Sequence, residues 1–156
     1  MAEGHRHRPE VGPRQDGPDP PGQSCEPQPL GELANIYFQA GDYKNSQLFS
    51  QKVVDANPKI DGAWVALGAA QFNQMNQTDA KTSWLKAIAI NPKNAEAHYD
   101  LGFLYLSGST PDMTAAKKEW ATVIAIDPKS DIAKTVQTHL ASPSPSAANP
   151  SASSGS

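Results

Sequence analysis

The chain has 156 residues, a charged fraction of 19% and a formal net charge of −3, which suits one compact domain with extensions. Between residues 30 and 141, 10 Lys balance 11 acidic residues, so the basic face that nucleic-acid binding requires is absent. No apolar run approaches the roughly 20 residues that span a bilayer. We therefore expect neither a nucleic-acid partner nor a membrane span in this chain.

The two ends of the chain differ in composition from its middle. Residues 1–29 hold seven of the 14 Pro and all three Arg, and residues 142–156 consist of Ser, Ala, Pro, Gly and Asn. Neither end carries enough apolar surface to offset the entropy lost on ordering, so we predict disordered tails around one domain at 30–141. The N-terminal tail lacks the apolar stretch of a secretory signal, and it contains the single cysteine, Cys25. The core is thus expected to have no disulfide and no thiolate nucleophile.

The first predicted unit covers about residues 27–60. Leu33 and Ala34 lie in its first helix, since apolar residues recur around them at helical spacing. A Gly-Asp pair then predicts the turn to the second helix. Pro58 closes that helix, because the residue before a proline avoids the helical conformation.

The second unit, residues 61–94, repeats this pattern. Asp61 is the predicted N-cap of its first helix and Thr78 that of its second, because a side-chain oxygen satisfies free backbone N–H groups at a helix start. Its packing residues are Leu67, Gly68, Ala80 and Trp84, and Pro92 closes it.

The third unit covers about residues 95–130 and contains an insertion. Trp84 and Trp120 are 36 residues apart instead of 34, so two residues have been added before the second helix. Thr110 and Pro111 predict the start of that helix, which leaves open whether the insertion widens the turn, lengthens the helix or does both. The packing residues of this unit are Leu101, Gly102, Ala116 and Trp120, followed by Pro128.

A last helix is predicted at residues 130–141. Ser130 is its expected N-cap, as Asn94 is that of the first helix in the third unit. Such a helix covers the last hairpin and shows a polar outer face, which repeat stacks need for solubility.

The three units share one register. Leu33, Leu67 and Leu101 are spaced 34 residues apart, and a tiny residue follows each of them. A period of this length predicts stacked helical hairpins and therefore an all-α fold. Stacks of this kind usually work as binding surfaces.

The register resembles that of the tetratricopeptide repeat, and the resemblance covers residues 27–141. The signature of the family's first helix is W-x-x-L-G-x-x-Y. Its counterparts here are Trp64-x-x-Leu67-Gly68-x-x-Gln71, His98-x-x-Leu101-Gly102-x-x-Tyr105 and Leu30-x-x-Leu33-Ala34-x-x-Tyr37. Ser50 departs from the family, which places an aromatic residue there, as at Trp84 and Trp120. The resemblance implies a right-handed superhelical stack of antiparallel hairpins with about seven helices.

The resemblance also implies a concave groove lined by the first helix of each unit. The positions that would contact a ligand are Glu32, Asn35, Phe38 and Gln39; Val65, Ala66, Ala69, Phe72 and Asn73; and Glu96, Tyr99, Asp100, Phe103 and Leu106. Two interpretations of Phe38, Phe72 and Phe103 stay open. Each ring packs under a neighbouring hairpin, or the three form an exposed apolar strip that binds a peptide or a helix.

Charge at these positions restricts the ligand. Some members of the family grip a C-terminal carboxylate with Lys, Asn and Arg side chains. Here Gly31 stands where a Lys is expected, and Glu96 and Asp100 replace basic residues. An apolar ligand with a basic end is therefore favoured over a carboxylate.

No residue pattern predicts catalysis, a cofactor or a metal site. His5 and His7 have no third metal ligand near them in the sequence. His98 is expected to be packed and hydrogen-bonded, and His139 has no partner group. We therefore predict a non-catalytic module that binds a protein or peptide in its groove.

Two alternatives stay open, and both concern the whole protein. One is self-association through the groove. The other is a scaffold or assembly subunit of a bacterial membrane-associated complex, whose membrane anchor is missing from this chain. The abrupt change from Arg in the N-terminal tail to Lys in the core motivates it, because such a change is compatible with an artificial or misassigned start. As written, the chain is predicted to be cytoplasmic; an anchored protein would be extracytoplasmic.

Overall fold

The computed structural model describes residues 29–141, where every regular element is a helix. The helices are α1 (Leu30–Gln39), α2 (Tyr43–Ala56), α3 (Asp61–Asn73), α4 (Gln77–Ile90), α5 (Ala95–Ser107), α6 (Met113–Ile126) and α7 (Asp131–Ala141). The all-α fold predicted from the sequence is therefore confirmed. The predicted tails lie outside the described residues, apart from residue 29.

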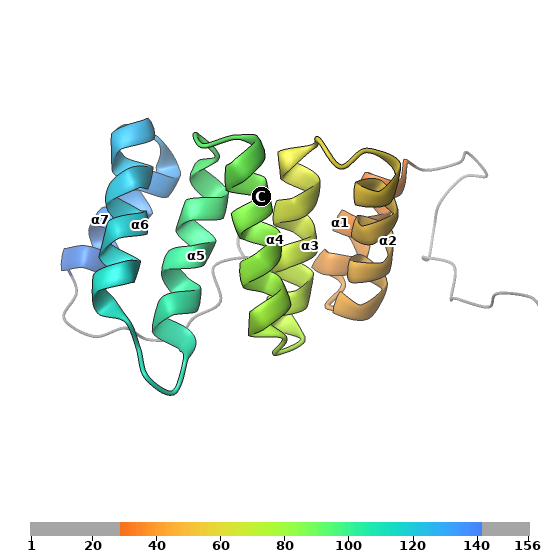
Figure 1. The fold of residues 1–156 in the computed structure, drawn as a ribbon, viewed down its shortest axis with the longest axis horizontal. Helices are drawn as coiled ribbons and strands as arrows, with labels where there is room; N and C mark the ends of the chain where they lie inside the picture. The colour runs from red at the N-terminus through yellow and green to blue at the C-terminus, as the bar shows by residue number, and fades with distance from the viewer. Residues whose placement is uncertain (1–28, 142–156) are drawn as a thin grey trace, which may run out of the picture.

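The helices pair into three hairpins, α1 with α2, α3 with α4 and α5 with α6, and α7 packs against the last of them. Figure 1 shows the hairpins standing side by side along the long axis of the molecule. The first helices α1, α3 and α5 contact one another in turn, and α5 contacts α7, whereas α2, α4 and α6 make only sparse contact with one another. The first helices and α7 therefore lie on one side of the stack. We call the surface that α1, α3, α5 and α7 present the inner face.

Most helix starts are capped by a side-chain oxygen. The residues that accept a hydrogen bond from the backbone N–H three residues on are Asp42, Asn76, Asn94, Asp112 and Ser130. Each satisfies an N–H group that has no partner within its helix. The predicted caps at Asn94 and Ser130 are confirmed.

The predicted cap at Asp61 is wrong. Ile60 precedes α3, and Asp61 is the first helical residue. Its carboxylate instead accepts hydrogen bonds from the side-chain amides of Asn91 at 2.7 Å and Asn94 at 2.9 Å. These bonds favour the charged form and lower the pKa of Asp61. Asp61 thus ties the start of α3 to the loop between α4 and α5.

Two further N-caps lie two residues away from the predicted ones. Asn76 caps α4 instead of Thr78, and Asp112 caps α6 instead of Thr110. Asn and Asp are somewhat better N-caps than Thr, which favours these positions. The loop before α6 has five residues against three before α4, while both helices have 14 residues. The insertion in the third unit therefore widens the turn and leaves the helix length unchanged.

Glycine and tryptophan pair at the centre of the second and third hairpins. Trp84 is 2% exposed, and its indole N–H donates to the backbone carbonyl of Val65 at 3.3 Å. Trp120 repeats this hydrogen bond with the carbonyl of Tyr99 at 3.2 Å. A Cβ added to Gly68 would lie 2.6 Å from Nε1 of Trp84, so only glycine lets the ring approach this closely.

The packing residues named from the sequence fall into two groups. Those that are buried are Ala34, Leu67, Gly68, Ala80, Trp84, Leu101, Gly102, Ala116 and Trp120, with Leu33 half-buried. Pro58, Pro92 and Pro128 are exposed, just beyond the ends of α2, α4 and α6. The prolines therefore end helices and contribute little to the core.

His98 takes the place in the third hairpin that Trp64 holds in the second. The indole N–H of Trp64 donates to the carbonyl of Pro58 at 2.9 Å. Nε2 of His98 lies 3.1 Å from the carbonyl of Pro92, which can only accept, so this nitrogen donates. Its Nδ1 lies 2.7 Å from a carboxylate oxygen of Glu119. The prediction of a packed, hydrogen-bonded histidine is confirmed.

Candidate functional site

The inner face carries most of the residues predicted to contact a ligand. The exposed ones are Glu32, Asn35, Gln39 and Glu96. The half-buried ones are Phe38, Ala66, Ala69, Phe72, Asn73, Phe103 and Leu106. The buried ones are Val65, Tyr99 and Asp100. The surface open to a ligand is thus narrower than the predicted set.

Val65 and Tyr99 belong to the core, contrary to the prediction that they line the groove. Val65 is 3% exposed and packs with Trp84 and Leu101 between the second and third hairpins. Tyr99 is 8% exposed, and burial together with the charge of Asp100 raises the pKa of its hydroxyl to about 12. Val65 therefore fills the space between the second and third hairpins, and Tyr99 fills the space between the third hairpin and α7. The register of the sequence repeat alone does not show how closely neighbouring elements pack.

Half-buried phenylalanines lie on three successive first helices. The rings of Phe38 and Tyr43 meet edge to face, with centroids 5.3 Å apart. The centroids of Phe72 and Trp84 lie 5.7 Å apart, and Phe103 packs likewise in the third hairpin. Each ring packs inside its own hairpin and keeps part of its surface open. The packing thus lies mainly within one hairpin and not under a neighbouring one, and binding of a peptide to the open part of the rings stays a prediction.

The ring of His139 on α7 packs against the third hairpin, a contact that the sequence did not predict. Its ring centroid lies 5.0 Å from that of Phe103 and 5.8 Å from that of Trp120. Ala133 and Val136 are fully buried on the same helix, and they dock α7 with His139 turned towards α5. The spacing of three residues between Val136 and His139 was the one signal in the sequence that could have revealed this contact.

Two carboxyl groups lie one helical turn apart on α5. Asp100 is 7% exposed, and no described residue donates a hydrogen bond to its side chain or pairs with it. Burial raises the pKa of Asp100 well above its usual value, and the charge of Glu96 adds to this effect. Glu96 is exposed, yet the surrounding protein limits its hydration enough to raise its pKa as well. A cation at this end of the inner face would stabilise both carboxylates.

Replacing Asp100 by asparagine is expected to stabilise the fold at neutral pH by about 1–3 kcal/mol, because the neutral amide avoids the cost of burying a carboxylate charge. The folded-state pKa of Asp100 lies above the unfolded-state value, so the folded protein holds the proton more tightly. The contribution of Asp100 to stability therefore falls as the pH rises through these two values.

Urea titrations of the Asp100→Asn variant and the wild type, at neutral pH and at about pH 4, check this expectation. The variant should be the more stable at neutral pH. Its advantage should shrink in acid, where Asp100 is protonated in the folded state. An equal advantage at both pH values would contradict the assigned cause.

Side chains that could bind a metal are not clustered within residues 29–141. Among residues 29–141, no three His, Cys, Asp or Glu side chains lie close enough to hold a metal ion. None of the helices in that range is both long and apolar enough to cross a membrane. His5, His7 and Cys25 lie outside the described residues.

Comparison with known families agrees with the geometry of the hairpins. A model of the tetratricopeptide repeat matches residues 27–60, and a second model, described as a TPR repeat, matches residues 76–108. The first match covers α1 and α2, and the second covers α4 and α5. The chain belongs to the tetratricopeptide-repeat (TPR) family. A comparison with curated proteins finds no match.

Several solved TPR structures share the fold of this TPR protein. The first TPR of Spaghetti (RPAP3), bound to the HSP90 peptide SRMEEVD, is 23% identical, covers 72% of this chain and 91% of its own, and has a TM-score of 0.61. The second TPR domain of human RPAP3, in complex with the HSP70 peptide SGPTIEEVD, is 16% identical over 73% and 93% of the two chains, with a TM-score of 0.62. The Yersinia enterocolitica type III secretion chaperone SycD, in complex with a peptide of the translocator YopD, is 15% identical over 72% and 84%, with a TM-score of 0.65. At sequence identities this low, the similarity shows a common fold and nothing more.

Proposed function

We propose that this TPR protein is a non-catalytic protein-interaction module that holds a segment of another protein on its inner face. The observation that carries the proposal is the row of half-buried rings Phe38, Phe72 and Phe103 on α1, α3 and α5. Partly open aromatic rings on successive helices provide apolar contact area for an extended peptide or a helix. The peptides bound by the similar TPR structures support this kind of function.

The charge of the inner face supports a ligand with a basic end. In the RPAP3 complexes, the bound peptides SRMEEVD and SGPTIEEVD each contain three acidic residues. Here Glu96 and Asp100 lie at one end of the face, and Glu32 is exposed near the other. Bringing an acidic peptide to these carboxylates would cost free energy, whereas a Lys or Arg side chain would be attracted to them.

Selection of random peptides on the immobilised full-length protein tests this function. We expect the selected peptides to combine an apolar residue with Lys or Arg. The Glu96→Lys variant should weaken their binding by at least tenfold, about 1.4 kcal/mol, because a like charge then faces the basic end. The Phe38→Ser variant should weaken binding through the loss of apolar contact.

The matched control is Asp55→Lys, which makes the same charge change at an exposed position on α2, away from the inner face. Its affinity should stay within about twofold of the wild type, since an exposed charge at this distance is screened by salt. Selected peptides that respond to Asp55→Lys as strongly as to Glu96→Lys would show that the inner face is not the binding surface.

A further inference from the structure

In the first hairpin a serine occupies the position of the buried tryptophans. Ser50 lies 34 residues before Trp84, in the same register of the second helix. The residue whose carbonyl accepts the indole N–H of Trp84 is Val65, and its counterpart in the first hairpin is Gly31. A Cβ at Gly31 would meet nothing within 4 Å. The first hairpin thus lacks both side chains that fill this space in the second.

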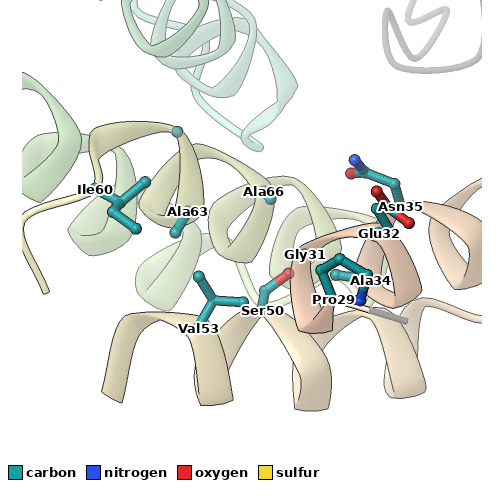
Figure 2. A pocket seen from close by; sticks show the side chains of 11 residues that line it. Pro29, Gly31, Glu32, Ala34, Asn35, Ser50, Val53, Ile60, Ala63 and Ala66 are labelled. Carbon is teal, nitrogen blue, oxygen red and sulfur yellow. The ribbon is translucent and has the colours of Figure 1, made fainter. Parts of the chain in front are cut away.

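A pocket of about 370 Å³ lies at this place, between α1, α2 and α3 (Figure 2). Gly31, Ala34 and Ala63 line it. Their counterparts in the second repeat frame, Val65, Gly68 and Ala97, pack around the indole of Trp84. The pocket therefore has the surroundings of an indole site, and an apolar cavity of about 150 Å³ is already large enough for benzene.

The pocket also contains an unsatisfied polar atom. The side chain of Ser50 lines it and is 1% exposed, and its Oγ has no hydrogen-bond partner among the described residues. Figure 2 shows the hydroxyl directed from α2 towards the side of the pocket formed by α1. Buried hydroxyl groups normally have a partner, because leaving one without any costs free energy. This hydroxyl is placed to bond to a group that enters the pocket.

We propose that this pocket receives an aromatic side chain of the partner segment, best of all the indole of a tryptophan. The ring lies between Ala34, Ala63 and Ala66, and its N–H donates to Oγ of Ser50. The proposal rests on the proposed function, because Glu32, Asn35 and Ala66 line the pocket and also belong to the inner face. A bound segment can therefore reach the pocket from that face.

The terminal residues of the printed sequence offer no phenyl, phenol or indole ring for the pocket. Residues 1–28 and 142–156, which lie outside the described part, contain no Phe, Trp, Tyr, Leu or Ile. Neither segment therefore contains the kind of ring that the pocket is proposed to receive. The carboxylate of Glu32 at the pocket adds a preference for a neutral or basic ligand, in agreement with the charge at the other end of the face.

The first probe is free indole. Its binding is monitored in two-dimensional NMR spectra of the full-length protein. We expect indole to shift the resonances of Ala34, Ala63 and Ala66 and to leave α6 and α7 unchanged. Indene, which has the same shape without the N–H, should bind more weakly than indole. In the Ser50→Ala variant this preference should disappear, because the hydroxyl that accepts the N–H is gone.

The double variant Ala34→Gly/Ser50→Trp fills the pocket from within and rebuilds the Gly–Trp pair of the other hairpins. Both changes are needed, because the Cβ of Ala34 would meet the new ring as a Cβ at Gly68 would meet Trp84. Indole-dependent shifts should vanish in the double variant and persist in Ala34→Gly alone, the matched control. Gly31→Val, whose Cβ would meet nothing within 4 Å, narrows the pocket and should weaken indole binding at least tenfold. This variant keeps the test valid if the double variant fails to fold.

Peptides selected on the wild type complete the test. They should carry an aromatic residue, and the filled variant should bind them about 30-fold more weakly, the ratio expected when a buried aromatic contact is lost. Peptides that respond to Glu96→Lys but bind the filled variant as well as the wild type would overturn the pocket proposal and leave the proposed function standing. Absence of indole-dependent shifts at Ala63 and Ala66 would overturn it too. Indole binding without any peptide binding would overturn the proposed function, and with it the partner assigned to the pocket.

Discussion

Replacing Trp84 by alanine is expected to lower the free energy of unfolding by about 3–5 kcal/mol. The side chain is 2% exposed and packs between α3, α4 and α5, where Val65 and Leu101 surround it. Its removal leaves a large cavity and deletes the hydrogen bond to the Val65 carbonyl. Stacked repeats depend on the contact between neighbouring hairpins. The total free energy of unfolding of a domain of this size is roughly 5–15 kcal/mol. The variant should therefore be close to unfolding at room temperature.

Urea titration followed by circular dichroism measures this loss. Leu85→Ala is the matched control, because Leu85 is the next residue on α4 and is 47% exposed. That change should cost well under 1 kcal/mol, since the side chain buries little apolar area. A loss below about 1 kcal/mol for Trp84→Ala would contradict the assigned role of the indole between the hairpins.

Replacing Gly102 by alanine is expected to destabilise the protein by about 1–3 kcal/mol, although alanine is the better helix former. A Cβ on Gly102 would overlap the indole ring of Trp120. Trp120 is 3% exposed and is held by a hydrogen bond to the Tyr99 carbonyl and by Phe103, so its rigid ring has little room to move. Overpacking therefore outweighs the gain in helix propensity.

Thermal unfolding of Gly102→Ala and Gly62→Ala separates the two effects. Gly62 lies in α3, where an added Cβ meets nothing within 4 Å. Gly62→Ala should stabilise the protein by up to about 1 kcal/mol, because only helix propensity changes. If both variants were stabilised equally, the close contact between Gly102 and Trp120 would not limit the packing of the third hairpin.

Much of the fold could be predicted because its signals are local. The helices, their turns and the small residues at the hairpin crossings repeat within each unit, so Leu67, Gly68 and Trp84 could be named without coordinates. Helix starts were predicted less well, because Asp61, Thr78 and Thr110 all have capping side chains and only the path of the loop decides between neighbours.

The candidate site was harder to predict than the fold. Register placed Phe38, Phe72 and Glu96 on the inner face, where they lie half-buried or exposed. It also placed Val65, Tyr99 and Asp100 there, and all three are buried: Val65 by the third hairpin, and Tyr99 by α6 and α7. How much of a side chain stays open depends on how closely two hairpins approach, which a repeat pattern does not state.

By itself, the sequence determined the repeat architecture, the number of hairpins and the loss of the aromatic residue at Ser50. Each of these features is a local pattern that can be seen within one repeat or by aligning the repeats. The tertiary structure alone decided that Asp100 is buried without a partner among residues 29–141 and that His139 packs on Phe103. It also decided that the absence of an indole at Ser50 leaves a pocket, and a hydroxyl with no hydrogen-bond partner in the described part of the chain, instead of a collapsed core. These properties arise where three helices meet, and the volume between them is set by all three at once.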